Sequence, residues 1–257
     1  MPIHLSDPYC AGDSLWHRAN PKVKLLLVIG FILTVNLLPA GAWLSLGLLA
    51  VLLWSAIFLA RLQPALLLKR SLLALPFILA AAPLPFTTPG HPLFPGWPIT
   101  YEGTLRLATI LARSWLSVQA AVLLVAVTPF YELLWGLHGL RVPRTLVSII
   151  GLMYRYIFVL GEEAGRLLRA RAARSALLPG RRPPGLFWQA RVAGNMVGVL
   201  FVRAIERSER VYFAMLARGY QGQVRVLAPP AWRATDTRLA LSTACALAAI
   251  IVLAQVS

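Results

Sequence analysis

The sequence is short of charged residues. Only 13% of its 257 residues are charged, against roughly 25% in an average soluble domain. Hydrophobic residues make up 58% of the chain, and they come in blocks rather than at an even density. This composition favours an integral membrane protein over a soluble protein with a large core.

Residues for covalent links, metal binding and ATP binding are also scarce. The two cysteines, Cys10 and Cys245, lie near opposite ends of the chain, so neither a disulfide framework nor a metal site is indicated. The four histidines are scattered without cysteines or carboxylates at ligand spacing, and we expect no metal or other cofactor. The chain contains no phosphate-binding Gly-Lys-Ser/Thr loop, which excludes an ATPase site within it. Its first 20 residues lack a central apolar run, so no cleavable signal peptide is expected.

The charge that is present is mostly basic. The chain carries 25 Lys and Arg against nine Asp and Glu, a net charge of +16. Sixteen of the basic residues fall between Phe130 and Arg233, a region that is also rich in Leu, Val, Ala and aromatic residues. Basic residues on apolar helices indicate membrane lipid or a docked protein partner, and they argue against nucleic acid.

Five apolar runs are candidates for membrane spans. They are 23–38, 42–60, 71–82, 104–127 and 239–256. The first two resemble a membrane hairpin, because each is near the ~20 residues that cross ~30 Å of hydrocarbon. Six prolines between residues 83 and 98 exclude regular helix there. The sequence therefore predicts an all-α fold, a polytopic membrane bundle of about five spans; a sixth span is left open.

Basic residues flank the predicted spans unevenly. They occur in the leader and in the link at 61–70, whereas none occurs from 71 to 105. By the positive-inside rule, the N-terminus and the basic region are cytoplasmic, and the proline-rich loop and the C-terminus are external. We therefore expect a multi-pass membrane protein with a cytoplasmic N-terminus.

These expectations divide the chain into four parts. They are a cytoplasmic leader at 1–22, a four-span bundle at 23–128 with an external loop at 83–103, a basic cytoplasmic region at 129–237, and a final span at 238–257.

The basic region is predicted to contain two long helices, at about 145–176 and 186–218. The intervening Pro and Gly residues of 178–185 must break the helix. Each helix has a glutamate four residues before an arginine, the order that favours an ion pair on one helix face; the pairs are Glu162 with Arg166 and Glu206 with Arg210. The apolar halves look short for a span, and whether either crosses the membrane is left open.

Both helices are predicted to end in an arginine between small residues. The endings are Ala173-Arg174-Ser175 and Ala217-Arg218-Gly219. Small neighbours allow another backbone to approach, and Gly219 can close a helix in the left-handed conformation. Arginine at a helix C-terminus is favoured by the dipole and offers a planar fork to a carboxylate. The alternative is a solvated helix end or a contact with lipid headgroups.

These endings resemble those of a known family, the transmembrane T component of energy-coupling factor transporters, in its CbiQ branch. The resemblance is strengthened by Ala214–Tyr220, by Arg155–Phe158 with Glu162 and Glu163 downstream, and by the leader His17–Leu25. It implies a non-catalytic subunit of an ATP-driven importer in the bacterial inner membrane, serving cobalt uptake, with nickel in close relatives.

The resemblance also implies partners. It makes Arg174 and Arg218 the anchors to two cytoplasmic ABC-type ATPase subunits, while the membrane part holds a separate substrate-binding subunit. The close approach is then provided by Ala173, Ser175, Ala217 and Gly219. Ser175 departs from the family, which often has glycine at this position.

The role of Arg113 and the function of the chain each leave alternatives open. Arg113 lies inside the fourth apolar run, where an arginine costs roughly 2.5–3.5 kcal/mol on insertion scales. It belongs either to a hydrogen-bond network within the bundle or to a contact with another membrane subunit.

The alternative function is an integral-membrane lipid-modifying enzyme, although the few acidic residues form no catalytic cluster. A basic membrane scaffold without an ATPase partner is a third class.

Overall fold

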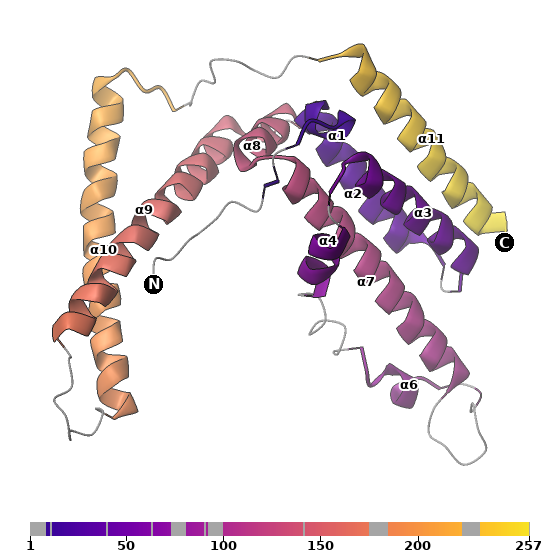
Figure 1. Ribbon diagram of the computed structural model, residues 1–257, viewed down its shortest axis with the longest axis horizontal. Coiled ribbons are helices and arrows are strands. Elements are labelled where there is room, and N and C mark those ends of the chain that lie inside the picture. Colours follow the sequence, from indigo (N-terminus) through magenta and orange to yellow (C-terminus); the bar gives the residue numbers. More distant parts are fainter. Residues whose placement is uncertain are drawn as a thin grey trace. The chain divides into compact units, whose positions relative to one another are not determined.

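The computed structural model describes most of the chain (Figure 1). The described residues are 9–10, 12–39, 41–62, 64–72, 81–89, 91, 100–140, 142–174, 185–222 and 232–256. They form helices joined by turns, which confirms the predicted all-α class. The helices are α1 (Leu15–Arg18), α2 (Pro21–Leu37), α3 (Trp43–Leu59), α4 (Pro64–Ser71), α6 (Leu84–Thr87), α7 (Tyr101–Val127), α8 (Phe130–Gly139), α9 (Arg144–Arg174), α10 (Leu186–Ala217) and α11 (Ala234–Val256).

The chain divides into two compact units. The first, called here the bundle unit, comprises the described parts of Pro8–Leu140 and Ala228–Ser257 and therefore holds α1 to α8 and α11. The second, called the arm unit, comprises the described part of Arg141–Leu227 and holds α9 and α10.

The predicted hairpin is formed by α2 and α3. Asn20 precedes α2, and its side-chain oxygen accepts a hydrogen bond from the Lys22 backbone N–H at 3.1 Å. Pro21 occupies the first turn, where its missing N–H costs nothing. The chain reverses through Gly41, whose φ of +94° lies in the left-handed region that favours glycine.

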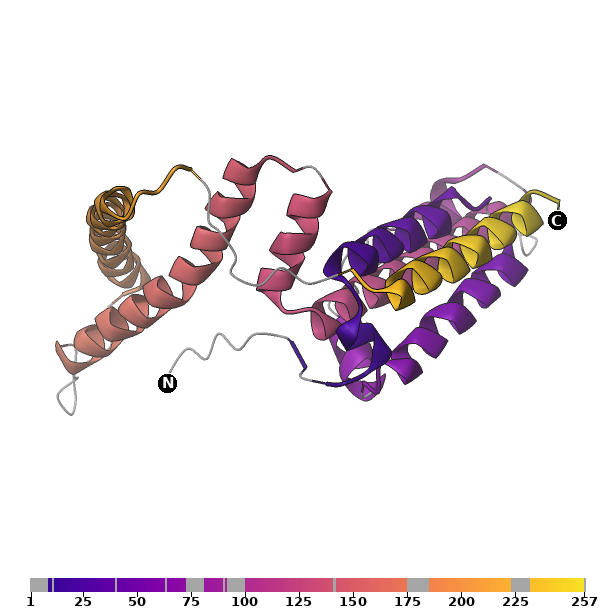
Figure 2. The same ribbon diagram turned by 90° about the horizontal axis from the view of Figure 1, so that it is seen from above.

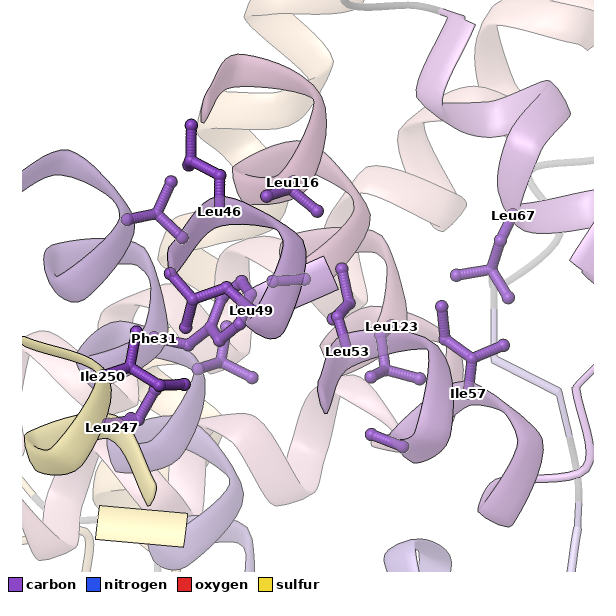
Figure 3. Close-up of a cluster of buried hydrophobic side chains, with 14 of the residues drawn as sticks. Phe31, Leu46, Leu49, Leu53, Ile57, Leu67, Leu116, Leu123, Leu247 and Ile250 are labelled. Carbon is purple, nitrogen blue, oxygen red and sulfur yellow. The ribbon is translucent and has the colours of Figure 1, made fainter. Parts of the chain in front are cut away.

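The core of the bundle unit lies where α2, α3, α7 and α11 meet (Figure 3). Figure 2 shows these helices running alongside one another. Val35 and Leu49 are fully buried, and Leu247 and Ile250 bring α11 against Phe31 of α2. The outer faces remain apolar: Leu37 is 73% exposed and Leu44 is 68% exposed. Apolar surface on this scale suits a bundle surrounded by lipid.

Three described helices are long and apolar enough to cross a membrane: α7, α9 and, over Ala234–Gln255, α11. The shorter α3 is apolar along its 17 residues. The predicted span at 71–82 falls mostly outside the described residues. The helix α9 has the length and hydropathy of a membrane span, whereas its apolar half alone was expected to be short for one.

Buried polar contacts join the leader to α8 and α11. Lys24 is 1% exposed, and its ammonium donates to the His17 carbonyl at 3.0 Å and lies 3.9 Å from the Glu132 carboxylate. Asp236 is 2% exposed and accepts backbone hydrogen bonds from Asn20 at 3.0 Å and from Arg233 at 2.9 Å. The bond from Arg233 caps α11, which therefore begins at Ala234, four residues before the predicted final segment.

Arg113 hydrogen-bonds within the bundle unit. Its guanidinium donates to the Leu38 carbonyl, which follows the last residue of α2. The last turn of a helix leaves carbonyls without helical partners, so a cation there satisfies one of them. This contact agrees with the interpretation of Arg113 as part of a network within the bundle.

Candidate functional site

The two long helices of the arm unit form as predicted. The helix α9 spans 31 residues and α10 spans 32, within two residues of the expected ends. They cross and contact each other (Figures 1 and 2). The crossing is joined by Arg203 of α10, which donates to the carboxylate of Glu163 on α9.

The two predicted glutamate–arginine pairs within these helices are wrong. Arg166 pairs with Glu163, three residues before it, rather than with Glu162. The side chain of Glu163 is 14% exposed and receives arginines from both helices. Glu162 is exposed and takes no part in these ion pairs. Within the described arm unit, Glu206 and Arg210 form no ion pair.

A charged groove runs along the contact between α9 and α10. It encloses about 240 Å³. Arginines and glutamates line most of it, together with two apolar side chains of α9; the lining residues are Val159, Leu160, Glu163, Arg203, Glu206, Arg207 and Arg210. The helices are thus joined by polar side chains rather than by an apolar core.

The end of α10 is closed by hydrogen bonds around Gly219. The Tyr220 N–H donates to the Met215 carbonyl at 3.0 Å, and the Gly219 N–H donates to the Leu216 carbonyl at 2.9 Å. Gly219 has a φ of +78°. This pair of bonds with a left-handed glycine is a Schellman motif, so the expected conformation of Gly219 is confirmed. Arg218 sits at the C-cap, directly before the turn.

Both predicted anchor arginines lie at exposed helix ends. Arg174 is the last residue of α9, and both it and Ala173 are exposed. Ala217, Arg218 and Gly219 are exposed as well. Ser175 lies outside the described residues. A Cβ added at Gly219 would meet no atom within 4 Å, so this end is open to another backbone.

An apolar face of α10 is also exposed. No residue of α10 is buried. Large apolar side chains recur every three or four residues on one side; those that are at least 44% exposed include Val197 (66%), Phe201 (65%), Ile205 (44%), Tyr212 (53%) and Leu216 (44%). Gly194 and Gly198 interrupt this face, and neither has an atom within 4 Å of an added Cβ. The face was not predicted from the sequence, where its signal is this helical spacing.

Metal-binding residues do not gather in the described structure. Among those residues, no group of three or more His, Cys, Asp and Glu side chains is placed to hold a metal ion.

Comparison with known proteins identifies the family. A family model described as CbiQ, cobalt transport protein, matches residues 12–227. The chain belongs to the CbiQ family. The match includes the second half of the leader and the whole of α9 and α10, with both arginine endings, and stops before α11. The chain is therefore a membrane protein of a cobalt transport family.

Several relatives resemble the chain over most of its length. The cobalt transport protein CbiQ of Rhodobacter capsulatus is 28% identical over 84% of this chain and 85% of its own length. The energy-coupling factor transporter transmembrane protein EcfT of Brevibacillus brevis is 30% identical over 84% of each chain. The EcfT protein of Lactococcus lactis is 27% identical over 86% of each.

Proposed function

We propose that this chain is the transmembrane coupling subunit of an energy-coupling factor importer. In this role it transmits the motion of ABC-type ATPase subunits to a substrate-binding membrane subunit, for cobalt uptake, with nickel as the alternative ion. The observation that carries the proposal is that both long helices of the arm unit end in an exposed arginine beside small residues. Relatives that bear the names CbiQ and EcfT support it.

The proposed mechanism rests on two rigid helices with charged tips. Arg174 and Arg218 each bind a carboxylate on an ATPase subunit, and Ala173, Ala217 and Gly219 let the partner backbone come close. The same role is proposed for Ser175. When ATP binding closes the ATPase pair, the bound tips move with it. The ion pair between Glu163 and Arg203 joins the two helices, so that movement of one is passed to the other.

We further propose that the N-terminus and the arm unit lie on the cytoplasmic side of the inner membrane, as the positive-inside rule predicts. Since α9 has the length and hydropathy of a span, its location needs a direct test. Single cysteines at Arg174 and His91, in a background without Cys10 and Cys245, are labelled with an impermeant thiol reagent. Cysteine at 174 should react only from the cytoplasmic side and cysteine at 91 only from outside. The opposite pattern would overturn this orientation.

The coupling role is tested by reversing the charge of each tip. Arg174→Glu and Arg218→Glu should lower co-purification of the ATPase subunits and stop cobalt uptake, because each replaces a charge-assisted contact by repulsion. Losing such a contact at a buried interface costs about 2–5 kcal/mol. Arg191→Glu is the matched control, since it makes the same charge change on an exposed part of α10 far from its end.

The outcome separates the proposed function from its rivals. Normal co-purification and uptake in both tip variants would refute the coupling role. Uptake of radioactive cobalt and nickel by the wild type, measured in competition, identifies the ion. Membership of the CbiQ family speaks against the alternative of a lipid-modifying enzyme.

A further inference from the structure

An apolar groove lies on the bundle unit, separate from the charged groove of the arm unit. It encloses about 230 Å³ between α2, α3 and α11, with α7 at its floor. This is smaller than the ~300–1,000 Å³ of a typical small-molecule pocket. Its lining includes Leu59 and Ser55 of α3 and Leu239, Ser242 and Thr243 of α11. Leu59 is 53% exposed, so the groove opens onto the outer surface of the bundle unit.

The hydroxyl groups in the groove already have hydrogen-bond partners. The Ser55 hydroxyl donates to the Leu52 carbonyl at 2.7 Å, and the Ser242 hydroxyl donates to the Leu239 carbonyl at 3.2 Å. Thr243 likewise donates to the Leu239 carbonyl, at 2.6 Å. Hydroxyls bonded within their own helices leave mainly hydrocarbon facing an occupant. The groove therefore suits a slender apolar chain rather than a polar solute.

Two arginines stand at one end of the groove. Arg61 follows Leu59 by two residues, and Arg238 directly precedes Leu239 and lies one helical turn before Ser242. Both are exposed, and neither forms an ion pair in the described bundle unit. Arg61 closes α3 with a φ of 53°. This left-handed position normally favours glycine, and a strained residue there is a reason to look for a role of its side chain.

We infer that the groove binds an acyl chain of an anionic phospholipid, whose headgroup phosphate contacts Arg61 and Arg238. The apolar groove fits one acyl chain, and the arginines match the charge of the headgroup. Both are on the end of the bundle unit where α3 ends and α11 begins. The inference requires only that the bundle unit is surrounded by lipid, and it is independent of the coupling role.

Native mass spectrometry of the full chain in detergent tests the site. The purified protein is titrated with phosphatidylglycerol or with phosphatidylcholine carrying the same acyl chains. Phosphatidylglycerol should bind more tightly, with one lipid retained first. Arg61→Gln and Arg238→Gln should each weaken phosphatidylglycerol binding about fivefold and leave phosphatidylcholine unchanged, because each arginine contributes through the anionic headgroup. Arg191→Gln, in the arm unit, is the matched control.

Filling the groove tests the acyl-chain part. Ser242→Phe and Ser55→Phe should each weaken the binding of both lipids, whereas Leu241→Phe should not, since Leu241 is 61% exposed and does not line the groove. Two separate filling variants protect the test against one that folds poorly. Equal binding of the two lipids by the wild type would overturn the inference. So would filling variants that bind like Leu241→Phe, because the lipid would then lie outside the groove.

Discussion

The Schellman turn at the end of α10 supports a quantitative prediction at Gly219. Alanine at this position must keep a φ of +78° or lose the turn. For an L-residue the left-handed conformation costs roughly 1–2 kcal/mol. Steric contact adds nothing, because an added Cβ meets no atom within 4 Å. The whole cost therefore falls on the two hydrogen bonds that close the helix and on the presentation of Arg218.

Hydrogen exchange followed by mass spectrometry measures this cost. In Gly219→Ala, the amides of residue 219 and Tyr220 should exchange about 5–30 times faster, the factor that corresponds to 1–2 kcal/mol. Gly198→Ala is the matched control, because it also adds a Cβ in open space but lies inside α10. There alanine should stabilise the helix by about 0.5–1 kcal/mol. The coupling proposal adds that Gly219→Ala, unlike Gly198→Ala, lowers co-purification of the ATPase. If the amides of residues 219 and 220 exchanged no faster in Gly219→Ala than in Gly198→Ala, the reasoning from φ would be refuted.

Two further predictions concern the carboxylates of Asp236 and Glu163. Asp236→Ala should lower the thermal unfolding temperature in detergent, because it leaves the Asn20 and Arg233 N–H groups without acceptors, at a cost of about 1–3 kcal/mol each. Asp236→Asn keeps one acceptor oxygen and should lose less stability. Equal losses in the two variants would contradict the capping role. Glu163→Gln should change stability by less than about 1 kcal/mol, since its arginine partners are exposed. The same variant should broaden the distance distribution between spin labels on α9 and α10, whereas Glu162→Gln should not; identical distributions would show that this ion pair does not hold the helices.

The long helices were predictable because their signals are local. Clusters of Pro and Gly delimit α9 and α10, and the apolar runs of the hairpin are separated by Pro39 and Gly41. The left-handed Gly219 was predictable for the same reason, since a glycine after a helical run is a local stop signal.

Features that depend on distant residues were missed. Asp236 caps α11 and also binds the Asn20 backbone, 216 residues away, so its burial could not be read from its neighbours. Likewise, Arg166 pairs with Glu163 rather than with Glu162. Arg203 from the other helix also binds Glu163. The sequence places two glutamates side by side, and only the crossing of α9 and α10 distinguishes them. The anchoring role of Arg174 and Arg218 stays a prediction, since it depends on a partner.

The exposure of α10 bears on how such a partner would be held. None of the 32 residues of this helix is buried, and even Phe201 and Phe213 are each 65% exposed. Four of its charged residues, Arg203, Glu206, Arg207 and Arg210, line the groove shared with α9, and none of its apolar residues does. A helix within a protein gains most of its stability from an apolar face that packs against another surface. Within the arm unit α9 does not supply that packing, and the coupling proposal assigns it to lipid or to another subunit. A helix held by surfaces outside its own chain can follow their movement, which is what a coupling element requires.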